Sequence, residues 1–280
     1  MRNLSRLPRN FHMSFKPERQ YLAAMLRFAA SGGSGTFQEI GKVTGIPMGT
    51  SSGKVPAILD YGRGMGLLKL LPESTRSSTK SPLLTQFGRT ILQEDPFLKC
   101  EVTQWLAHFN MCRPTAGADV WYRTFFEAAS SLAGQFQRSR LEEYLGGVYA
   151  VSKGNAIGPM VGMYEDEAAF RSCGAIAEES GLLRRRRAPI ADEFALGYSA
   201  WMLQMVEDLF PGQNQVPVTE LDRKGGWRKI TGWSASNAQA VLDLLSRKGS
   251  IAVDRNMDPW LIQPRVSAEK AWRNIFDDMI

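Results

Sequence analysis

The sequence predicts a mainly α-helical protein with small β wings, in which two winged helix-turn-helix domains flank a helical middle. Three observations predict this fold class: ordered helix start and stop signals between residues 36 and 84, a second copy of that pattern near the C-terminus, and helical periodicity between the two. The predicted domains are residues 1–92, 93–212 and 213–280.

The first winged domain begins with a capping box. In residues 36–39, Thr-Phe-Gln-Glu, the Thr hydroxyl and the Glu carboxylate can each bind a free backbone N–H of the first turn. Gly45 can take the positive φ that ends this helix. Ser51 or Ser52 can cap the next helix, which we expect to run from Ser52 to Tyr61, to be closed by the glycines at 62, 64 and 66, and to enter the DNA major groove.

A β wing follows this second helix. Leu67–Leu71 is an apolar run of strand length, residues 72–82 contain no core-forming side chain, and Leu83-Leu84 can return as the partner strand. Polar and basic side chains around such a motif hold phosphates. The candidate DNA contacts are therefore Ser51, Ser52, Lys54, Arg63, Lys69, Arg76 and Lys80.

The distribution of charge favours DNA over the alternative, a winged helix that binds protein or forms dimers. Residues 1–90 contain 13 Lys+Arg against 4 Asp+Glu, a net charge of +9, although the whole chain carries only +6. Residues 91–180 carry −5 and residues 181–280 carry +2. Basic ends around an acidic middle indicate that the ends face a polyanion and the middle faces another partner.

Several functional classes are disfavoured by composition. No apolar run of about 18 residues is present and the N-terminus lacks an apolar signal segment, which predicts a soluble cytoplasmic protein without membrane contact. The three cysteines have no metal-ligand spacing, so we expect no metal and no cofactor. His108 is interpreted as a core or interface histidine, and not as a catalytic residue. The protein is therefore expected not to be an enzyme.

The middle of the chain is predicted to be mostly helical. One helix, Leu141–Val151, is expected to open with a capping box at Ser139. Carboxylates at 165–167 are expected to begin another that reaches Glu179 and stops at Gly181. The run Arg184, Arg185, Arg186 and Arg187 follows, and it is either a phosphate or acidic-partner contact or simply solvated.

The last segment repeats the first motif. Residues 43–46 match 230–233 at an offset of 187, and residues 57–60 match 240–243 at an offset of 183, so the second turn is four residues shorter. Ser236 is expected to cap a second reading helix, Asn237–Lys248, followed by a short hairpin. Its candidate nucleic-acid contacts are Lys229, Asn237, Gln239, Arg247, Lys248 and Arg255. A terminal helix, Val266–Met279, packs back or pairs in a homodimer.

Four segments carry a family resemblance: FKPERQYLAAMLRFA, TFQEIGKVTGIPMGTSSGKVPAILDYGRGMGLL, SPLLTQFGRTILQEDPFLKCEVTQWLAHFNM and ADVWYRTFF. Together they resemble the bacterial family known as domain of unknown function four-thousand-seven. The resemblance implies a companion of sulfurtransferase or adenosine-phosphosulfate-reductase-like proteins in DNA phosphorothioation and phage-defence gene clusters. It transfers no catalytic residue.

The leading functional prediction is a non-enzymatic accessory protein of a bacterial defence or DNA-modification system, which holds duplex DNA through its winged helices and a protein partner through its middle. Two alternatives stay open. The first is a transcriptional regulator of its own gene cluster. The second is an assembly subunit of a sulfur-transfer or modification complex that binds protein and not DNA. A hydrolase or nuclease is disfavoured, because the sequence offers neither an acidic metal cluster nor a nucleophile beside a base.

Overall fold

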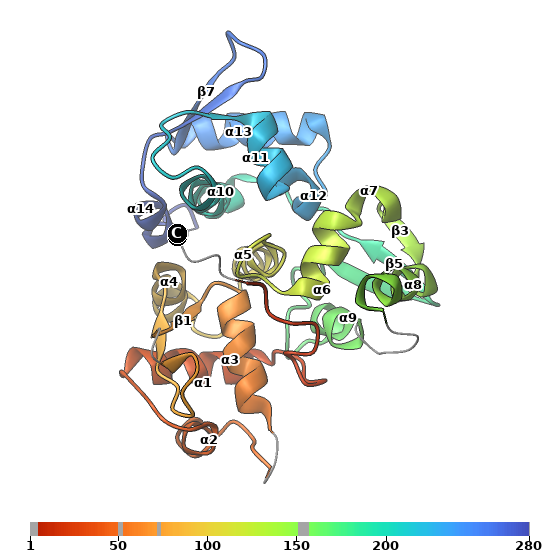
Figure 1. Ribbon diagram of the computed structural model, residues 1–280. Coiled ribbons are helices and arrows are strands. Elements are labelled where there is room, and N and C mark those ends of the chain that lie inside the picture. The colour runs from red at the N-terminus through yellow and green to blue at the C-terminus, as the bar shows by residue number, and fades with distance from the viewer. Residues whose placement is uncertain (1–4, 50–52, 72–73, 151–156, 280) are drawn as a thin grey trace. The chain divides into compact units, whose positions relative to one another are not determined.

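The protein is mainly α-helical and, within its described residues, carries three small antiparallel sheets (Figure 1). The computed structural model describes residues 5–49, 53–71, 74–150 and 157–279. The chain divides into two compact units, residues 1–186 and 187–280. The division between the units falls inside the predicted middle domain, and the three-domain organisation stays a prediction.

Three helices and a hairpin open the first unit. They are α1 (Arg19–Ala30), α2 (Phe37–Thr44), α3 (Lys54–Gly64), β1 (Leu68–Leu70) and β2 (Pro82–Leu84). The two strands are antiparallel, and Leu68 pairs with Leu84. This order of elements is the one that the start and stop signals predict.

The predicted boundaries of α2 are confirmed. The Thr36 hydroxyl accepts the N–H of Glu39 at 3.3 Å, and the Glu39 carboxylate accepts the N–H of Thr36 at 2.7 Å. At the other end Gly45 has a φ of 72° and its N–H donates to the carbonyl of Gly41. A reciprocal cap and a left-handed glycine therefore fix both ends of this helix.

Helix α3 differs from its prediction at both ends. It begins at Lys54, and the predicted caps Ser51 and Ser52 lie outside the described residues. It continues to Gly64, past the expected end at Tyr61, because Gly62 and Gly64 serve close packing, whereas Gly66, with a φ of 74°, follows the end of the helix as predicted. A Cβ on Gly62 would lie 2.7 Å from Leu68, and one on Gly64 would lie 2.7 Å from Met111.

Further helices complete the first unit. They are α4 (Gln86–Glu94), α5 (Glu101–Met111), α6 (Asp119–Tyr122), the π-helix Arg123–Glu127, α7 (Ala129–Leu132), α8 (Arg138–Tyr149) and α9 (Gly158–Glu165). The capping box predicted at Ser139 is wrong, because α8 already begins at Arg138 and Gln137 precedes it without a side-chain cap.

A three-stranded sheet replaces part of the predicted helical middle. Its strands β3 (Gln135–Gln137), β4 (Ile176–Glu179) and β5 (Leu182–Arg185) pair in the order β3-β5-β4. The predicted helix reaching Glu179 is wrong, since α9 ends at Glu165. The cause is local: Ser180 and Gly181 have φ values of 51° and 79°, so two left-handed residues turn the chain back into a hairpin.

The second unit has helices around another small sheet. Its elements are the 3₁₀ turn Asp192–Phe194, α10 (Ala195–Leu209), β6 (Val216–Pro217), α11 (Val218–Gly225), α12 (Trp227–Thr231), α13 (Ala235–Arg247), β7 (Ile251–Asp254), β8 (Leu261–Pro264) and α14 (Ala268–Arg273). The strands pair in the order β6-β8-β7. A helix pair followed by a hairpin thus occurs in both units, as the repeat predicts.

The cap of α13 is Ser234 and not the predicted Ser236. The Ser234 hydroxyl accepts the N–H of Asn237 at 3.2 Å, and the Asn237 side chain accepts the N–H of Ser234 at 3.3 Å. The helix therefore begins two residues earlier than expected.

The terminal helix packs back on its own unit. The Trp272 indole N–H donates to the Gln204 side chain of α10 at 3.2 Å, and the N–H of Ala268 donates to Glu207 at 2.8 Å. This settles the position of α14 within the second unit, and the predicted homodimer stays a prediction.

Candidate nucleic-acid interface

Two exposed cations lie on the hairpin that follows α3. Lys69 is on β1, paired in register with Leu83, and Arg76 is in the connection between the strands. Neither side chain makes a hydrogen bond or ion pair with any residue that the structure describes. Both charges are therefore available to an anion from solution.

Lys80 has a different role on the same hairpin. Its ammonium donates to the carbonyls of Ser74 and Thr75 at 3.1 Å each and to that of Ser77 at 2.6 Å. Its backbone exchanges two hydrogen bonds with Gly35, of 2.7 and 3.1 Å. An ammonium has three donors. Lys80 thus uses them to shape the connection between the strands, and not to meet a phosphate.

The two predicted cations of α3 are neutralised within the fold. Lys54 forms an ion pair with Glu18 and lies 4.9 Å from the centre of the Tyr21 ring. Arg63 pairs with Asp60 at 2.6 Å. Burial raises the pKa of Asp60, and the neighbouring Arg63 opposes that rise. Neither cation is presented to solvent as an unpaired charge.

Helix α3 has no exposed side chain, because every one of its residues is buried or half-buried. Tyr61 lies fully inside, edge-on to the rings of Phe11 and Trp121, with its hydroxyl donating to the carbonyl of Phe15 at 3.1 Å. A helix that reads bases needs a solvent-facing side. The predicted reading helix of the first unit is instead its central core helix.

The arginine run divides by orientation along β5 and beyond. Arg184 is exposed. Arg185 turns inward over the Phe125 ring, 4.9 Å from its centre, and burial lowers the pKa of this guanidinium to about 10. Arg186 pairs with Glu101 at 2.9 Å. Among these three arginines, only Arg184 is exposed and has no ion pair with a described residue.

In the second unit, α13 does present an open face. Its exposed residues are Ala235, Ser236, Gln239, Ala240, Ser246 and Arg247. Asn237 is committed to the cap and also accepts a hydrogen bond from Arg187 at 3.1 Å. Gln239 and Arg247 are thus the predicted contacts of α13 that face solvent.

Two of the other predicted contacts of this unit take part in ion pairs. Lys248 pairs with Asp278 at 2.8 Å, which raises the pKa of Lys248. Arg255 pairs with Asp243 and lies over the Trp260 ring at 4.7 Å. The remaining one, Lys229 on α12, is exposed.

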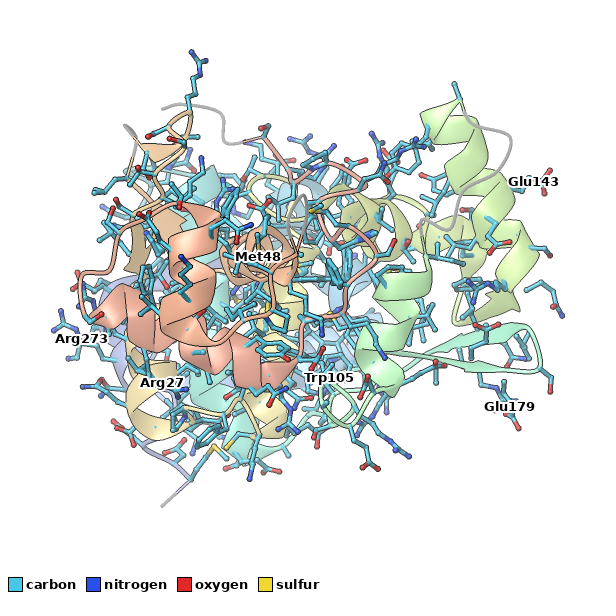
Figure 2. All side chains as sticks on the ribbon, turned by 90° about the horizontal axis from the view of Figure 1, so that it is seen from below. Arg27, Met48, Trp105, Glu143, Glu179 and Arg273 are labelled. Carbon is cyan, nitrogen blue, oxygen red and sulfur yellow. The ribbon has the colours of Figure 1, made fainter. Side chains whose placement is uncertain are left out.

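Three exposed cations of the first unit were not among the predicted contacts. They are Arg27 at the end of α1, which Figure 2 labels, together with Lys42 on α2 and Arg89 on α4. Within the described part of the chain their side chains form no hydrogen bond or ion pair. The net charge of residues 1–90 includes these three cations. The sequence prediction takes its DNA contacts only from residues near the expected reading helix, and so it misses them.

A buried polar cluster surrounds His108. The Trp121 indole N–H donates to the Tyr164 hydroxyl at 2.8 Å, and that hydroxyl lies 2.7 Å from Nδ1 of His108. The Tyr164 hydroxyl therefore links the indole of Trp121 to the imidazole of His108. Cys112 lies 3.8 Å from the same ring, and burial raises the pKa of its thiol.

This cluster has the character of a polar core. His108, Cys112 and Trp121 are fully buried and Tyr164 is 2% exposed. A general base must reach its substrate directly or through one water. The geometry therefore agrees with the interpretation of His108 as a core histidine.

The described residues contain neither a cluster of metal-ligating side chains nor a helix that could span a membrane. No group of three or more His, Cys, Asp or Glu side chains among them could hold a metal ion. Among the helices described, none is both long enough and apolar enough to cross a membrane.

Part of the sequence matches a known protein family. Residues 65–158 match the family described as protein of unknown function (DUF4007). The predicted resemblance is thereby confirmed. No curated protein matches the sequence.

Two solved structures have a similar fold. "SspB crystal structure" has a TM-score of 0.70 at 15% identity and covers 99% of this chain and 89% of that chain. "Magnesium ion-bound SspB crystal structure" has a TM-score of 0.67 at 16% identity and covers 96% of this chain and 87% of that chain. At these identities the similarity concerns the fold alone.

Proposed function

We propose that this protein is a non-enzymatic, cytoplasmic DNA-binding accessory protein of a bacterial defence or DNA-modification system linked to phosphorothioation. One observation carries the proposal. In a segment with a net charge of +9, exposed cations project without an ion pair to any described residue. These unpaired N-terminal cations are Arg27, Lys42, Lys69, Arg76 and Arg89.

The order of elements supports a winged helix-turn-helix in each unit. In the first, α2 and α3 are followed by the antiparallel hairpin β1–β2. In the second, α12 and α13 are followed by the hairpin β7–β8. A helix pair followed by a hairpin is the arrangement in which such domains bring a helix and a wing to DNA.

The first unit contacts the phosphate backbone and does not read bases through α3. Its central helix has no exposed side chain, and its cations Lys54 and Arg63 are paired internally. Phosphate contacts position a protein on duplex DNA and carry no sequence information of their own. Base readout, where it occurs, comes from the open face of α13, on which Gln239 can address an adenine edge.

The proposed biological setting rests on the family resemblance. The matched residues, 65–158, include β2, α4 and α5 and most of the acidic middle. Exposed acids lie there, including Glu143 on α8, which points outward in Figure 2. This acidic surface, which would repel DNA, is the side that we propose for a protein partner of the modification or defence complex.

Binding of the full chain to a fluorescein-labelled duplex at fixed, low salt tests the proposal. The variant carries Lys69→Ala, Arg76→Ala and Arg89→Ala. At ~0.1 M salt each lost phosphate contact is expected to weaken binding about tenfold. The matched control replaces Lys99, Arg265 and Lys270, which are also exposed and unpaired among the described residues, by Ala.

Both variants lose three positive charges, so only the position of the charges differs. A selective loss in the first variant supports phosphate contacts on the hairpin and α4. Equal losses would mean that binding depends on total charge alone, and would contradict a defined interface.

An assembly subunit that binds protein is the second candidate. The internal pairing of Lys54 and Arg63 and the burial of α3 favour it, because they remove the usual means of reading DNA. The same titration separates the two candidates. An assembly subunit shows no duplex binding by the wild-type chain at low salt.

A further inference from the structure

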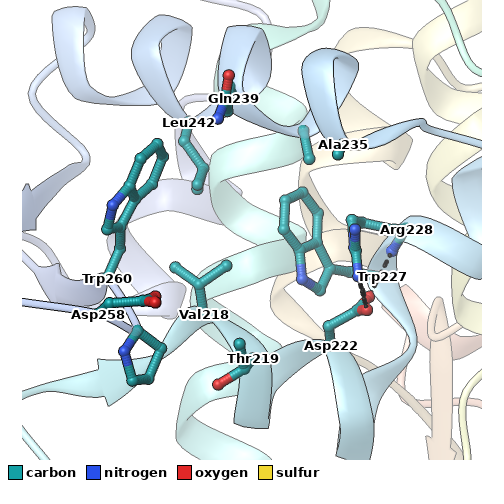
Figure 3. A pocket seen from close by; sticks show the side chains of 12 residues that line it. Val218, Thr219, Asp222, Trp227, Arg228, Ala235, Gln239, Leu242, Asp258 and Trp260 are labelled. Atoms are coloured by element: carbon teal, nitrogen blue, oxygen red, sulfur yellow. Dashed lines mark hydrogen bonds and ion pairs between the residues drawn. The ribbon is translucent and has the colours of Figure 1, made fainter. Parts of the chain in front are cut away.

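A pocket of about 360 Å³ lies within the second unit, between α11, α13 and the hairpin β7–β8. Figure 3 shows the rings of Trp227 and Trp260 on opposite sides of it, with Leu242 and Val218 between them. Trp227 is fully buried and Leu242 is 1% exposed, whereas Trp260 on the hairpin is half-buried. The pocket therefore has a rigid apolar floor and one aromatic wall that stands on the hairpin.

The charges around this pocket are mostly neutralised. Arg228 donates two hydrogen bonds to the carboxylate of Asp222, of 2.6 and 3.0 Å, on the Trp227 side. Arg255 on the hairpin pairs with Asp243. Asp258 lies on the Trp260 side, is exposed, and makes no side-chain hydrogen bond or ion pair within the described part of the chain. The charge left unpaired beside the pocket is thus negative.

We propose that this pocket binds an aromatic side chain of a partner protein, presented by a segment with a basic residue next to it. Pockets of a few hundred Å³ with apolar walls and a few polar groups are typical binding sites. Aromatic side chains are the usual anchors of protein interfaces, and a neighbouring Lys or Arg would meet Asp258.

A nucleobase fits this site less well. Inserting one would bring its phosphates toward Asp258. The second unit also lacks an excess of positive charge, with 11 Lys+Arg and 12 Asp+Glu in residues 187–280. Polyanion binding depends on such an excess. Charge complementarity thus favours a basic peptide over a nucleic acid.

The site goes beyond the function proposed above, and the phosphate contacts proposed for the first unit can fail without it, or it without them. The DNA contacts proposed for the first unit lie on the hairpin β1–β2 and on α1, α2 and α4. The pocket uses none of these residues, and of the side chains proposed to contact DNA it includes Gln239 of α13.

Nuclear magnetic resonance of the full chain, labelled with ¹⁵N at tryptophan, tests the proposal directly. The indole N–H of Trp227 has no hydrogen-bond partner in the described structure, and that of Trp260 lies on the opposite wall, so both resonances report on the pocket. They are assigned from Trp227→Phe and Trp260→Phe. The probes are the capped tripeptides Lys-Phe-Lys and Glu-Phe-Glu, and adenosine monophosphate.

We expect Lys-Phe-Lys to shift both resonances and to bind about fivefold more tightly than Glu-Phe-Glu, as for one exposed ion pair. Asp258→Lys reverses this preference, whereas Asp277→Lys, a change at an exposed acid outside the pocket, leaves it unchanged. Ala238→Phe fills the pocket and Trp260→Ala removes a wall. Each of these abolishes the shifts, and the remaining indole resonances show that the fold is retained.

Two results would overturn the proposal. One is tighter binding of adenosine monophosphate than of Lys-Phe-Lys, which would identify the pocket as a nucleotide site. The other is the absence of any shift of either indole resonance with millimolar peptide.

Discussion

Replacing Tyr164 by Phe removes one hydroxyl from the buried cluster of the first unit. That hydroxyl accepts from the Trp121 indole at 2.8 Å and lies 2.7 Å from Nδ1 of His108. Phe keeps the ring and its packing. The change therefore isolates the two hydrogen bonds from the hydrophobic contribution.

The expected loss of folding stability follows from the two buried polar atoms that lose a hydrogen bond. Trp121 Nε1 loses its acceptor and Nδ1 of His108 loses its hydrogen bond to Tyr164, both at buried positions. Leaving a buried polar group unsatisfied costs about 1–3 kcal/mol, so we expect the free energy of unfolding to fall by about 2–4 kcal/mol. For a unit of this size that corresponds to a decrease in Tm of about 5–15 °C.

Urea and thermal unfolding, followed by circular dichroism and tryptophan fluorescence, measure this loss. Tyr144→Phe is the matched control: its hydroxyl donates to Glu127 at 2.6 Å, but the bond is exposed and water can replace it. The control is expected to change stability by less than about 1 kcal/mol. A loss below about 1 kcal/mol for Tyr164→Phe itself would refute the interpretation of this cluster as a polar core.

Two further changes test other parts of the first unit. Burial lowers the pKa of His12 from 6.5 to about 4, so the unfolded chain binds more protons than the folded one between these values. Stability should therefore fall by about 3 kcal/mol as pH decreases from 6.5 to 4, and His12→Gln should flatten that part of the pH profile in urea titrations. A Cβ on Gly88 would lie 2.0 Å from the carbonyl oxygen of Leu67. Gly88→Ala should thus cost more than about 2 kcal/mol in the same titrations, whereas Gly147→Ala, with open space around it, should cost nothing.

The sequence predicts those features of the fold that depend on local chemistry. The capping box at Thr36 and Glu39 and the left-handed Gly45 appear as expected, because the residues that interact are three or four positions apart. The repeat likewise predicts a helix and hairpin in the second unit. Interactions of this range can be recognised from residue types and their spacing.

The predictions fail where one residue type allows two local structures. Gly181 is predicted to stop a helix, but with Ser180 it forms a two-residue turn between strands. The Ser180-Gly181 dipeptide between two short runs is the sequence signal for the missing hairpin. Ser236 is the predicted cap of α13, but Ser234, two residues earlier and of the same type, caps it instead.

The candidate site depends on contacts between residues far apart in sequence, and here the sequence was least informative. Lys54 meets Glu18, 36 residues away, and Arg186 meets Glu101. No spacing rule identifies such partners, so paired and unpaired cations look the same in the sequence. The structure separates them, and it adds Arg27, Lys42 and Arg89 to the exposed cations without an ion pair among the described residues.

The most direct test of the central claim is the salt dependence of duplex binding by the wild-type chain and by the variant Lys69→Ala, Arg76→Ala, Arg89→Ala. The logarithm of the binding constant falls with the logarithm of salt concentration by about 0.9 for each phosphate neutralised. If these cations hold phosphates, the wild-type slope is steep and the variant slope is shallower by about 2–3. If the two slopes coincide, or the wild type does not bind at low salt, these cations do not contact DNA and the account is wrong.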